Sequence, residues 1–174
     1  VGNNLSWNYG QHSPLFTPWG TLMVSADGPS RAMPYDPKLP DTSNYSRAVE
    51  YRIDEQKMTV TQVWDCGRTN EDVRLYTDRV GIAEPEPRTG NVLIDFGYIR
   101  DVDGQLPSRI APNAITFRIL EVTHDAVPQV VFDESFFDYS NTLSRVRGDF
   151  SYRGHRIPYL YAVPSNGCAA VTIN

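Results

Sequence analysis

The sequence predicts an all-β protein that is built from repeated four-stranded antiparallel units, and three observations lead to this fold class. Apolar and polar residues alternate in several short segments, as in strands with one buried face. Thirteen prolines and twelve glycines divide the 174 residues into pieces that are too short for long helices. A pattern of two consecutive hairpins also occurs twice along the chain. The predicted architecture is therefore two similar sheets in succession.

The first unit contains two predicted hairpins. "HSPLFTPWGTLMVSADG", residues 12–28, has two apolar runs that are separated by a Pro-Trp-Gly turn. "SRAVEYRIDEQKMTVTQVWDCG", residues 46–67, alternates with a period of two on both sides of "DEQK". Its apolar positions are Val49, Tyr51, Ile53, Met58 and Val60, with Glu50, Arg52 and Asp54 on the polar face. The unit is expected to span residues 7–67, with a proline-rich loop at 29–45 between its hairpins.

The second unit repeats this order over residues 75–136. "DRVGIAEPEPRTGNVLIDFG" is the first hairpin, and "NAITFRILEVTHDAVPQVVFDESF" is the second, with its turn at "THDA". Ala48 aligns with Ala114 at an offset of 66 residues, and Val60 aligns with Val127 at an offset of 67. Residues 99–112 form the corresponding loop. A third unit is expected to begin at "RGDFSYRGHRIPYLYAVP", with an inner strand at 148–163 and a C-terminal tail at 164–174.

Radially repeated four-stranded sheets are typical of a β-propeller, which closes with about four to eight blades. Two blades and part of a third cannot close a ring, and open blades leave sheet faces and edges exposed. This interpretation predicts a truncated or processed chain and an upstream polypeptide that completes the ring. The residues alone leave a second architecture open, a small β-sandwich that uses all of the strands within one chain.

Composition excludes several classes of function. The net charge of −5 and the pI near 5.1 argue against binding to nucleic acid or to an anionic membrane surface, because both require concentrated Lys and Arg. No stretch approaches the roughly 20 apolar residues of a membrane helix. No Cys, His and Asp cluster has the spacing of a metal site, so neither a metal nor another cofactor is expected. Cys66 and Cys168 permit one disulfide or two separate thiols.

Three segments carry a family resemblance. "GQHSPLFTPWGTLMVSADG", followed by an arginine-containing loop and "YSRAVEYRIDEQKMTVTQVWDCG", closely resembles the C-terminal part of bacterial arylsulfate sulfotransferases, and "YRGHRIPYLY" resembles the closing strand of that family. The resemblance runs from about Trp7 to Tyr161. It implies the last blades of a six-bladed β-propeller and a periplasmic or extracellular location. A Cys66–Cys168 disulfide is compatible with export.

The resemblance implies that a sulfuryl group passes from a phenolic sulfate ester to an acceptor phenol through a sulfohistidine, without a nucleotide sulfate donor. His12, after Gly-Gln at the start of an inner strand, matches the nucleophile. A neutral imidazole is a competent nucleophile near pH 7 because its pKa lies close to that value. The competing interpretation of His12 is a hydrogen-bonded histidine at a strand end.

Three further residues match positions that could contact the substrate. Arg31 in "DGPSRAMP" would bind sulfuryl oxygens through its planar guanidinium, and it could instead be an exposed loop arginine. Tyr152 would contact the aryl ring or the leaving oxygen, and Arg153 would add positive potential. A packed tyrosine and a surface arginine are the alternatives. His155 receives no role, and His124 is expected to be a solvent-exposed turn residue.

The chain departs from the family pattern at two points. Pro14 stands where some members have an asparagine, and a second histidine, the proposed acid/base partner, lies upstream in the family and has no counterpart here. The chain is therefore predicted to be inactive without the upstream blades. The alternative function is a non-catalytic, propeller-derived structural or ligand-binding module. The sequence leaves open which phenols serve as donor and acceptor and whether the chain forms a homo-oligomer.

Overall fold

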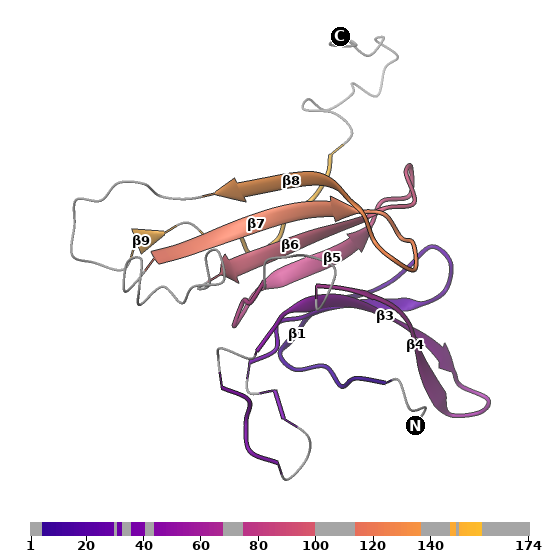
Figure 1. Ribbon diagram of the computed structural model, residues 1–174. Helices are drawn as coiled ribbons and strands as arrows, with labels where there is room; N and C mark the ends of the chain where they lie inside the picture. Colours follow the sequence, from indigo (N-terminus) through magenta and orange to yellow (C-terminus); the bar gives the residue numbers. More distant parts are fainter. Residues whose placement is uncertain are drawn as a thin grey trace, which may run out of the picture.

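The computed structural model describes residues 5–29, 31–32, 36–40, 44–67, 75–99, 114–136, 147–148 and 150–157. These ranges contain nine strands and no helix (Figure 1), so none of their segments forms an apolar helix that could cross a membrane. The strands are β1 (Gln11–Phe16), β2 (Leu22–Ala26), β3 (Arg47–Asp54), β4 (Thr59–Cys66), β5 (Gly81–Pro85), β6 (Val92–Ile99), β7 (Ala114–Val122), β8 (Val130–Phe136) and β9 (Arg147–Gly148). The predicted all-β class is confirmed.

Each unit forms its own antiparallel sheet from four consecutive strands. The first sheet has the order β1-β2-β3-β4, and the second has the order β5-β6-β7-β8, with β9 parallel to β7. No strand among the described residues crosses from one sheet to the other, as strands often do in a Greek-key sandwich. All four predicted hairpins are present. The arrangement is consistent with two neighbouring propeller blades.

The two sheets bury a shared apolar core, and the second sheet approaches the first through β5, which contacts β1, β2 and β3 (Figure 1). The largest buried side chains of this core include Met23 from the first sheet and Phe96 from the second. Trp64 of β4 and Leu120 of β7 extend the core away from β5. Burial of this apolar surface is the main force that holds the two units together.

The polar face predicted for the 46–67 hairpin is only partly exposed. Glu50 is 1% exposed because the first half of β3 is covered on this side by the second sheet. Met58 does not begin a strand but closes the turn with a positive φ of 51°, so β4 starts at Thr59. The predicted alignment of Val60 with Val127 is also wrong. Val60 lies in β4, whereas Val127 lies in the longer β7–β8 turn, three residues before β8 begins at Val130.

The start of the third unit lies against the second sheet. The amide of Ser151 donates to the carbonyl of Gly97 (3.0 Å), and its hydroxyl donates to Asp95. A Cβ on Gly97 would overlap the carbonyl oxygen of Ser151, so this close approach requires glycine. Residues 150–157 form no strand, and the inner strand expected at 148–163 stays a prediction. Cys66 is buried, whereas Cys168 lies outside the described residues.

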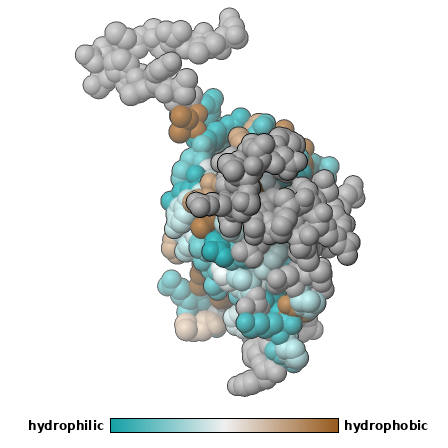
Figure 2. Space-filling model, turned by 90° about the vertical axis from the view of Figure 1, so that its left-hand side faces the viewer, coloured by the Kyte–Doolittle hydropathy of each residue, from teal (hydrophilic) through white to brown (hydrophobic). Residues whose placement is uncertain are grey.

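The described surface is mainly hydrophilic on the face shown in Figure 2, with apolar residues in small patches. On the first sheet, β3, β4 and the turn between them expose Ile53, Met58, Val60 and Val63, and on the second sheet β8 exposes Val130, Val131 and Phe132. Scattered apolar residues are usual on a protein surface, but a group on one sheet face marks a surface that another element could cover.

Candidate functional site

His12 is the second residue of β1 and pairs with Ser25 of β2. Directly after it, the ladder is interrupted by a bulge between His12 and Leu15. Ser13 in this bulge has a φ of +48°, and Pro14, which has no N–H to donate, lies where ladder pairing is lost. Bulges re-aim side chains and recur near active sites. The His12 side chain is 33% exposed, so solvent and a ligand can reach the imidazole.

Asp27 is the acidic partner of His12. It follows the last residue of β2, where its amide donates to the carbonyl of Gly10 and fixes its position beside β1. Its Oδ2 lies 3.1 Å from Nε2 of His12, and the side chain is fully buried. Burial raises the pKa of Asp27 to about 8, the hydroxyl of Ser25 opposes this shift, and the negative charge of Asp78 adds to it. Perturbed carboxyls beside a histidine are frequent in functional sites.

Arg31 lies in the loop after β2 and is 5% exposed, so the alternative of an exposed loop arginine does not hold. Its Nη1 donates to the carbonyl of Trp7 (3.3 Å), and its Nη2 donates to the carbonyl of Tyr45 (3.1 Å). The guanidinium also stacks on the Tyr45 ring, 4.0 Å from its centroid, and lies 5.3 Å from the centroid of Tyr9. Arg31 therefore ties the N-terminal segment to the loop beside Asp27.

The segment 150–157 reaches the His12 bulge through Arg153. Nη2 of Arg153 donates to Oγ of Ser13 (3.2 Å), and that hydroxyl donates in turn to the carbonyl of Gly81 (3.1 Å). Tyr152, the preceding residue, is 64% exposed, so it is not a packed tyrosine. The structure thus gathers His12, Asp27, Ser13 and Arg153 at one end of β1. Roles for Arg31, Tyr152 and Arg153 in substrate binding stay predictions.

The other two histidines have carboxylate partners away from this bulge. The expectation for His124 is wrong: it is not a solvent-exposed turn residue but lies 2.5 Å from Glu50, with its ring between Trp19 and Trp64. Trp19 belongs to the β1–β2 turn, at the opposite end of β1 from His12. His155 contacts Glu84 (2.5 Å) at the surface.

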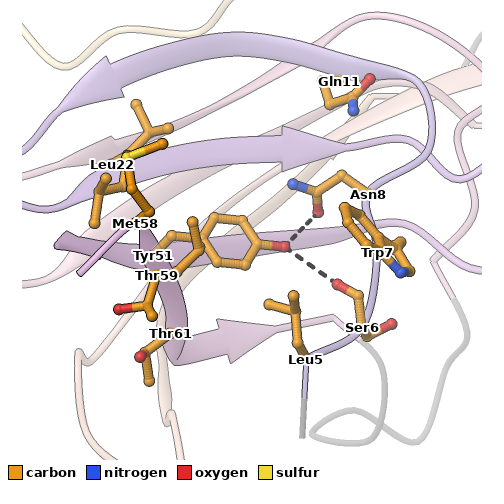
Figure 3. Close-up of a pocket in the computed structure, with 12 residues that line it drawn as sticks. Leu5, Ser6, Trp7, Asn8, Gln11, Leu22, Tyr51, Met58, Thr59 and Thr61 are labelled. Carbon is orange, nitrogen blue, oxygen red and sulfur yellow. Dashed lines mark hydrogen bonds between the residues drawn. The ribbon is translucent and has the colours of Figure 1, made fainter. Parts of the chain in front are cut away.

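A pocket of about 640 Å³ opens on the side of the first sheet that faces away from the second sheet (Figure 3). Tyr51 lies at its centre, and its hydroxyl donates to Oδ1 of Asn8 (2.8 Å) and to the carbonyl of Ser6 (3.3 Å). Leu22 and Met58 line one side of it. His12 is not part of this lining, so this pocket and the histidine bulge are separate features.

Sequence reasoning missed Asp27 and the Glu50–His124 pair. Asp27 carried a usable signal, because an acidic residue at the end of one hairpin strand lies near the start of the other. Glu50 and His124 are 74 residues apart, and no local pattern predicts their contact. No group of three or more His, Cys, Asp or Glu is arranged for a metal ion in the described parts of the chain.

The comparisons with known proteins show the family of the chain. The family model described as Arylsulfotransferase (ASST) matches residues 2–137. Arylsulfate sulfotransferase AssT of Escherichia coli O6:H1 is 42% identical over 120 residues, which cover 69% of this chain and 20% of that protein. The protein of the same name from Lelliottia amnigena is 40% identical over 65 residues, which cover 37% of this chain and 10% of that protein. The chain thus spans a fifth or less of these relatives, and it belongs to the arylsulfotransferase family.

Proposed function

We propose that this chain is the C-terminal part of an aryl sulfotransferase in which His12 carries a sulfuryl group from a phenolic sulfate ester to an acceptor phenol. The observation that carries the proposal is the His12 imidazole, which is reachable by solvent and lies 3.1 Å from the buried carboxylate of Asp27. A nucleophile whose base or charge partner lies within contact distance is the usual arrangement for covalent catalysis. The family match covers this part of the chain.

The reaction proceeds in two displacements at sulfur. In the first, a ring nitrogen of His12 attacks, the N–S bond forms, and the S–O bond to the aryl group breaks with its electron pair leaving on the phenoxide. In the second, the oxygen of the acceptor phenol attacks the same sulfur, and the N–S bond breaks to restore the imidazole. The proton of the acceptor phenol goes to a base that we place on the upstream polypeptide, at the position of the family's second histidine.

Positive charge near the bulge supports the transfer of an anionic group. Arg153 uses one donor on Ser13, and its planar guanidinium presents further N–H groups that can bind sulfuryl oxygens and charge developing in the transition state. The exposed ring of Tyr152 is available to contact the aryl group. Arg31 would act on the same oxygens from the loop after β2, at the expense of its contacts with Trp7 and Tyr45.

The remaining blades are supplied by an upstream polypeptide that completes a six-bladed propeller. Two observations support this part of the proposal. The chain spans 20% of its E. coli relative, and the first sheet exposes Ile53, Met58 and Val60 beside the pocket around Tyr51. A preceding blade would cover this face as the first sheet covers the second. Export to the periplasm or cell exterior and a Cys66–Cys168 disulfide belong to the same proposal.

A comparison of three preparations tests the function. The chain alone, the chain together with the upstream polypeptide, and the same assembly with His12→Ala are mixed with an aryl sulfate and an acceptor phenol. Turnover is expected only in the second preparation, and His12→Ala should lower it by about a thousandfold or more. Turnover by the isolated chain would contradict the need for upstream blades. Binding of aryl ligands without any turnover by the complete assembly would instead indicate the non-catalytic module.

A further inference from the structure

Asp27 is poised to control which nitrogen of His12 can react. Its Oδ2 lies 3.1 Å from Nε2 of the ring, and both carboxylate oxygens are buried without a hydrogen-bond partner among the described residues, whereas the imidazole is one-third exposed. The backbone fixes this approach, because the amides of Asp27 and Gly28 donate to the carbonyls of Gly10 and Tyr9, just before β1. The two side chains are therefore held together by the hairpin itself and not by a mobile loop.

We propose that Asp27 is the positioning residue for His12: its carboxylate keeps the ring proton on Nε2 and so leaves Nδ1 to take the sulfuryl group. This inference rests on the proposed function. A neutral imidazole carries one proton, and a hydrogen bond at one nitrogen decides which nitrogen keeps a free lone pair. Orientation of a catalytic histidine by a buried carboxylate is worth several orders of magnitude in hydrolases that use a Ser-His-Asp triad.

The same carboxylate also stabilises the charge that develops on the ring. When Nδ1 forms the N–S bond and the S–O bond breaks toward the phenoxide, the ring becomes positively charged while its proton remains on Nε2. The negative charge of Asp27, 3.1 Å away in a buried setting, opposes this positive charge more effectively than water does. When the N–S bond breaks in the second displacement, the electron pair returns to Nδ1 and the ring is neutral again.

The protonation state of Asp27 makes this control depend on pH. Burial raises its pKa to about 8, so at neutral pH the carboxyl holds a proton for much of the time. A protonated Asp27 would donate to Nε2, which would move the ring proton to Nδ1 and block that nitrogen. The charged and titratable groups that face Asp27 are His12 from β1 and Asp78 from the segment before β5. Asp78 is itself paired with Arg79 (2.7 Å).

The experiment uses the complete assembly with upstream blades and compares wild type, Asp27→Asn and the control Asp54→Asn, whose partly exposed carboxylate ends β3 and pairs with Lys57. One arm measures the rate of sulfuryl uptake by His12 in a single turnover on both sides of pH 8. In wild type this rate should rise as the pH passes through about 8. Asp27→Asn should lower the rate above pH 8 by about tenfold to a hundredfold and remove the rise, and Asp54→Asn should change neither.

A second arm uses ¹⁵N NMR of labelled histidine in the unliganded assembly. The neutral His12 ring should carry its proton on Nε2 above pH 8 in wild type, and the preference should be lost in Asp27→Asn. A wild-type ring that carries its proton on Nδ1 above pH 8 would overturn the inference, as would wild-type uptake rates and pH dependence in Asp27→Asn. If no adduct forms on His12 in wild type, the proposed function fails, and the NMR arm still decides the role of Asp27 because it needs no substrate.

Discussion

His124 and Glu50, which are 74 residues apart in the sequence, meet across the contact between the two sheets with Nε2 and Oε2 2.5 Å apart. The imidazole lies between the rings of Trp19 and Trp64, with centroid distances of 5.2 and 5.1 Å. The hydroxyl of Thr21 and the indole of Trp19 donate to the other oxygen of Glu50. The buried carboxylate of Glu50 thus has three hydrogen-bonding partners, and this cluster stabilises the contact between the two sheets.

Glu50→Gln should weaken the contact between the sheets by about 1–3 kcal/mol, because the charge-assisted bonds to His124 and Trp19 are lost inside a partly desolvated cluster. Denaturant unfolding of the assembly measures this loss. The exposed Glu55→Gln is the matched control and should have no effect. Equal unfolding midpoints for Glu50→Gln and wild type would show that the cluster contributes nothing to stability.

The same pair predicts a pH dependence. Burial acts to raise the pKa of Glu50, but hydrogen bonds from Thr21, Trp19 and His124 outweigh it and place the pKa below 4.5. A carboxyl whose folded pKa is depressed stabilises the protein above its unfolded pKa, and this contribution is lost as the pH falls through the folded value. The difference in unfolding free energy between wild type and Glu50→Gln should therefore shrink below about pH 4.5. A difference that grows with acidification would contradict this sign.

Asp27 should act on stability in the opposite direction. Its folded pKa of about 8 lies above the ordinary value of 3.8, so the folded state holds a proton that the unfolded state releases between these values. Stability contributed by this group is present at low pH and falls as the pH rises from about 4 to 8. Asp27→Asn removes the cost of a buried charge. Its melting temperature should exceed that of wild type at pH 8 by at least about 2–4 °C, corresponding to about 1 kcal/mol.

The comparison is repeated at pH 5, where the advantage of Asp27→Asn should be much smaller because only a small part of the fall in stability between about pH 4 and 8 has then occurred. A constant difference between the variant and wild type at both pH values would argue against a strongly raised pKa. The protein is therefore expected to be less stable at the pH where His12 is most reactive. Such a loss of stability in favour of activity is common at functional sites.

Gly97→Ala should detach the segment that carries Arg153. A Cβ at this position overlaps the carbonyl oxygen of Ser151, which is backbone and has no room to move without breaking the hydrogen bond of Ser151 to Gly97. Hydrogen exchange at the Ser151 amide should become faster, and aryl sulfate turnover by the assembly should fall. Glu55→Ala is the control, since its side chain is exposed in the β3–β4 turn, away from this contact. Unchanged protection of Ser151 in Gly97→Ala would contradict the observed packing.

Arg153→Ala should lower kcat/KM of the assembly by about a hundredfold, the scale seen when one donor to a developing oxyanion is removed. The structural reason is its position on Ser13, one residue from His12. The exposed Arg52→Ala controls for loss of a positive charge elsewhere and should keep the wild-type rate. Steady-state kinetics of both variants distinguishes a role of Arg153 in turnover from a general effect of positive surface charge.

The local part of this fold could be predicted from the sequence. Alternation around Val49 and Tyr51 and the turn at "DEQK" define a hairpin that needs no distant contacts. The family resemblance also singled out His12, because its flanking residues form a recognisable segment. These predictions depend on neighbours within a few positions, which is the range over which period and turn chemistry act.

What could not be predicted depends on how the sheets pack. Glu50 looked like a solvent-facing residue because its own strand alternates, and only the second sheet makes that face buried. His124 looked like an exposed turn residue for the same reason. The link between Arg153 and Ser13 spans 140 residues and follows from a bulge and a close glycine contact that have no periodic signal.

The central claim is that His12 carries the sulfuryl group, and mapping the adduct tests it most directly. The chain, together with its upstream polypeptide, is exposed briefly to an aryl sulfate without acceptor phenol, quenched and digested at mildly alkaline pH, and analysed by peptide mass spectrometry. The account predicts one added sulfuryl group on the peptide that contains His12, which disappears when an acceptor phenol is added. A sulfuryl group on another residue, or turnover with no protein adduct at any time, would contradict it.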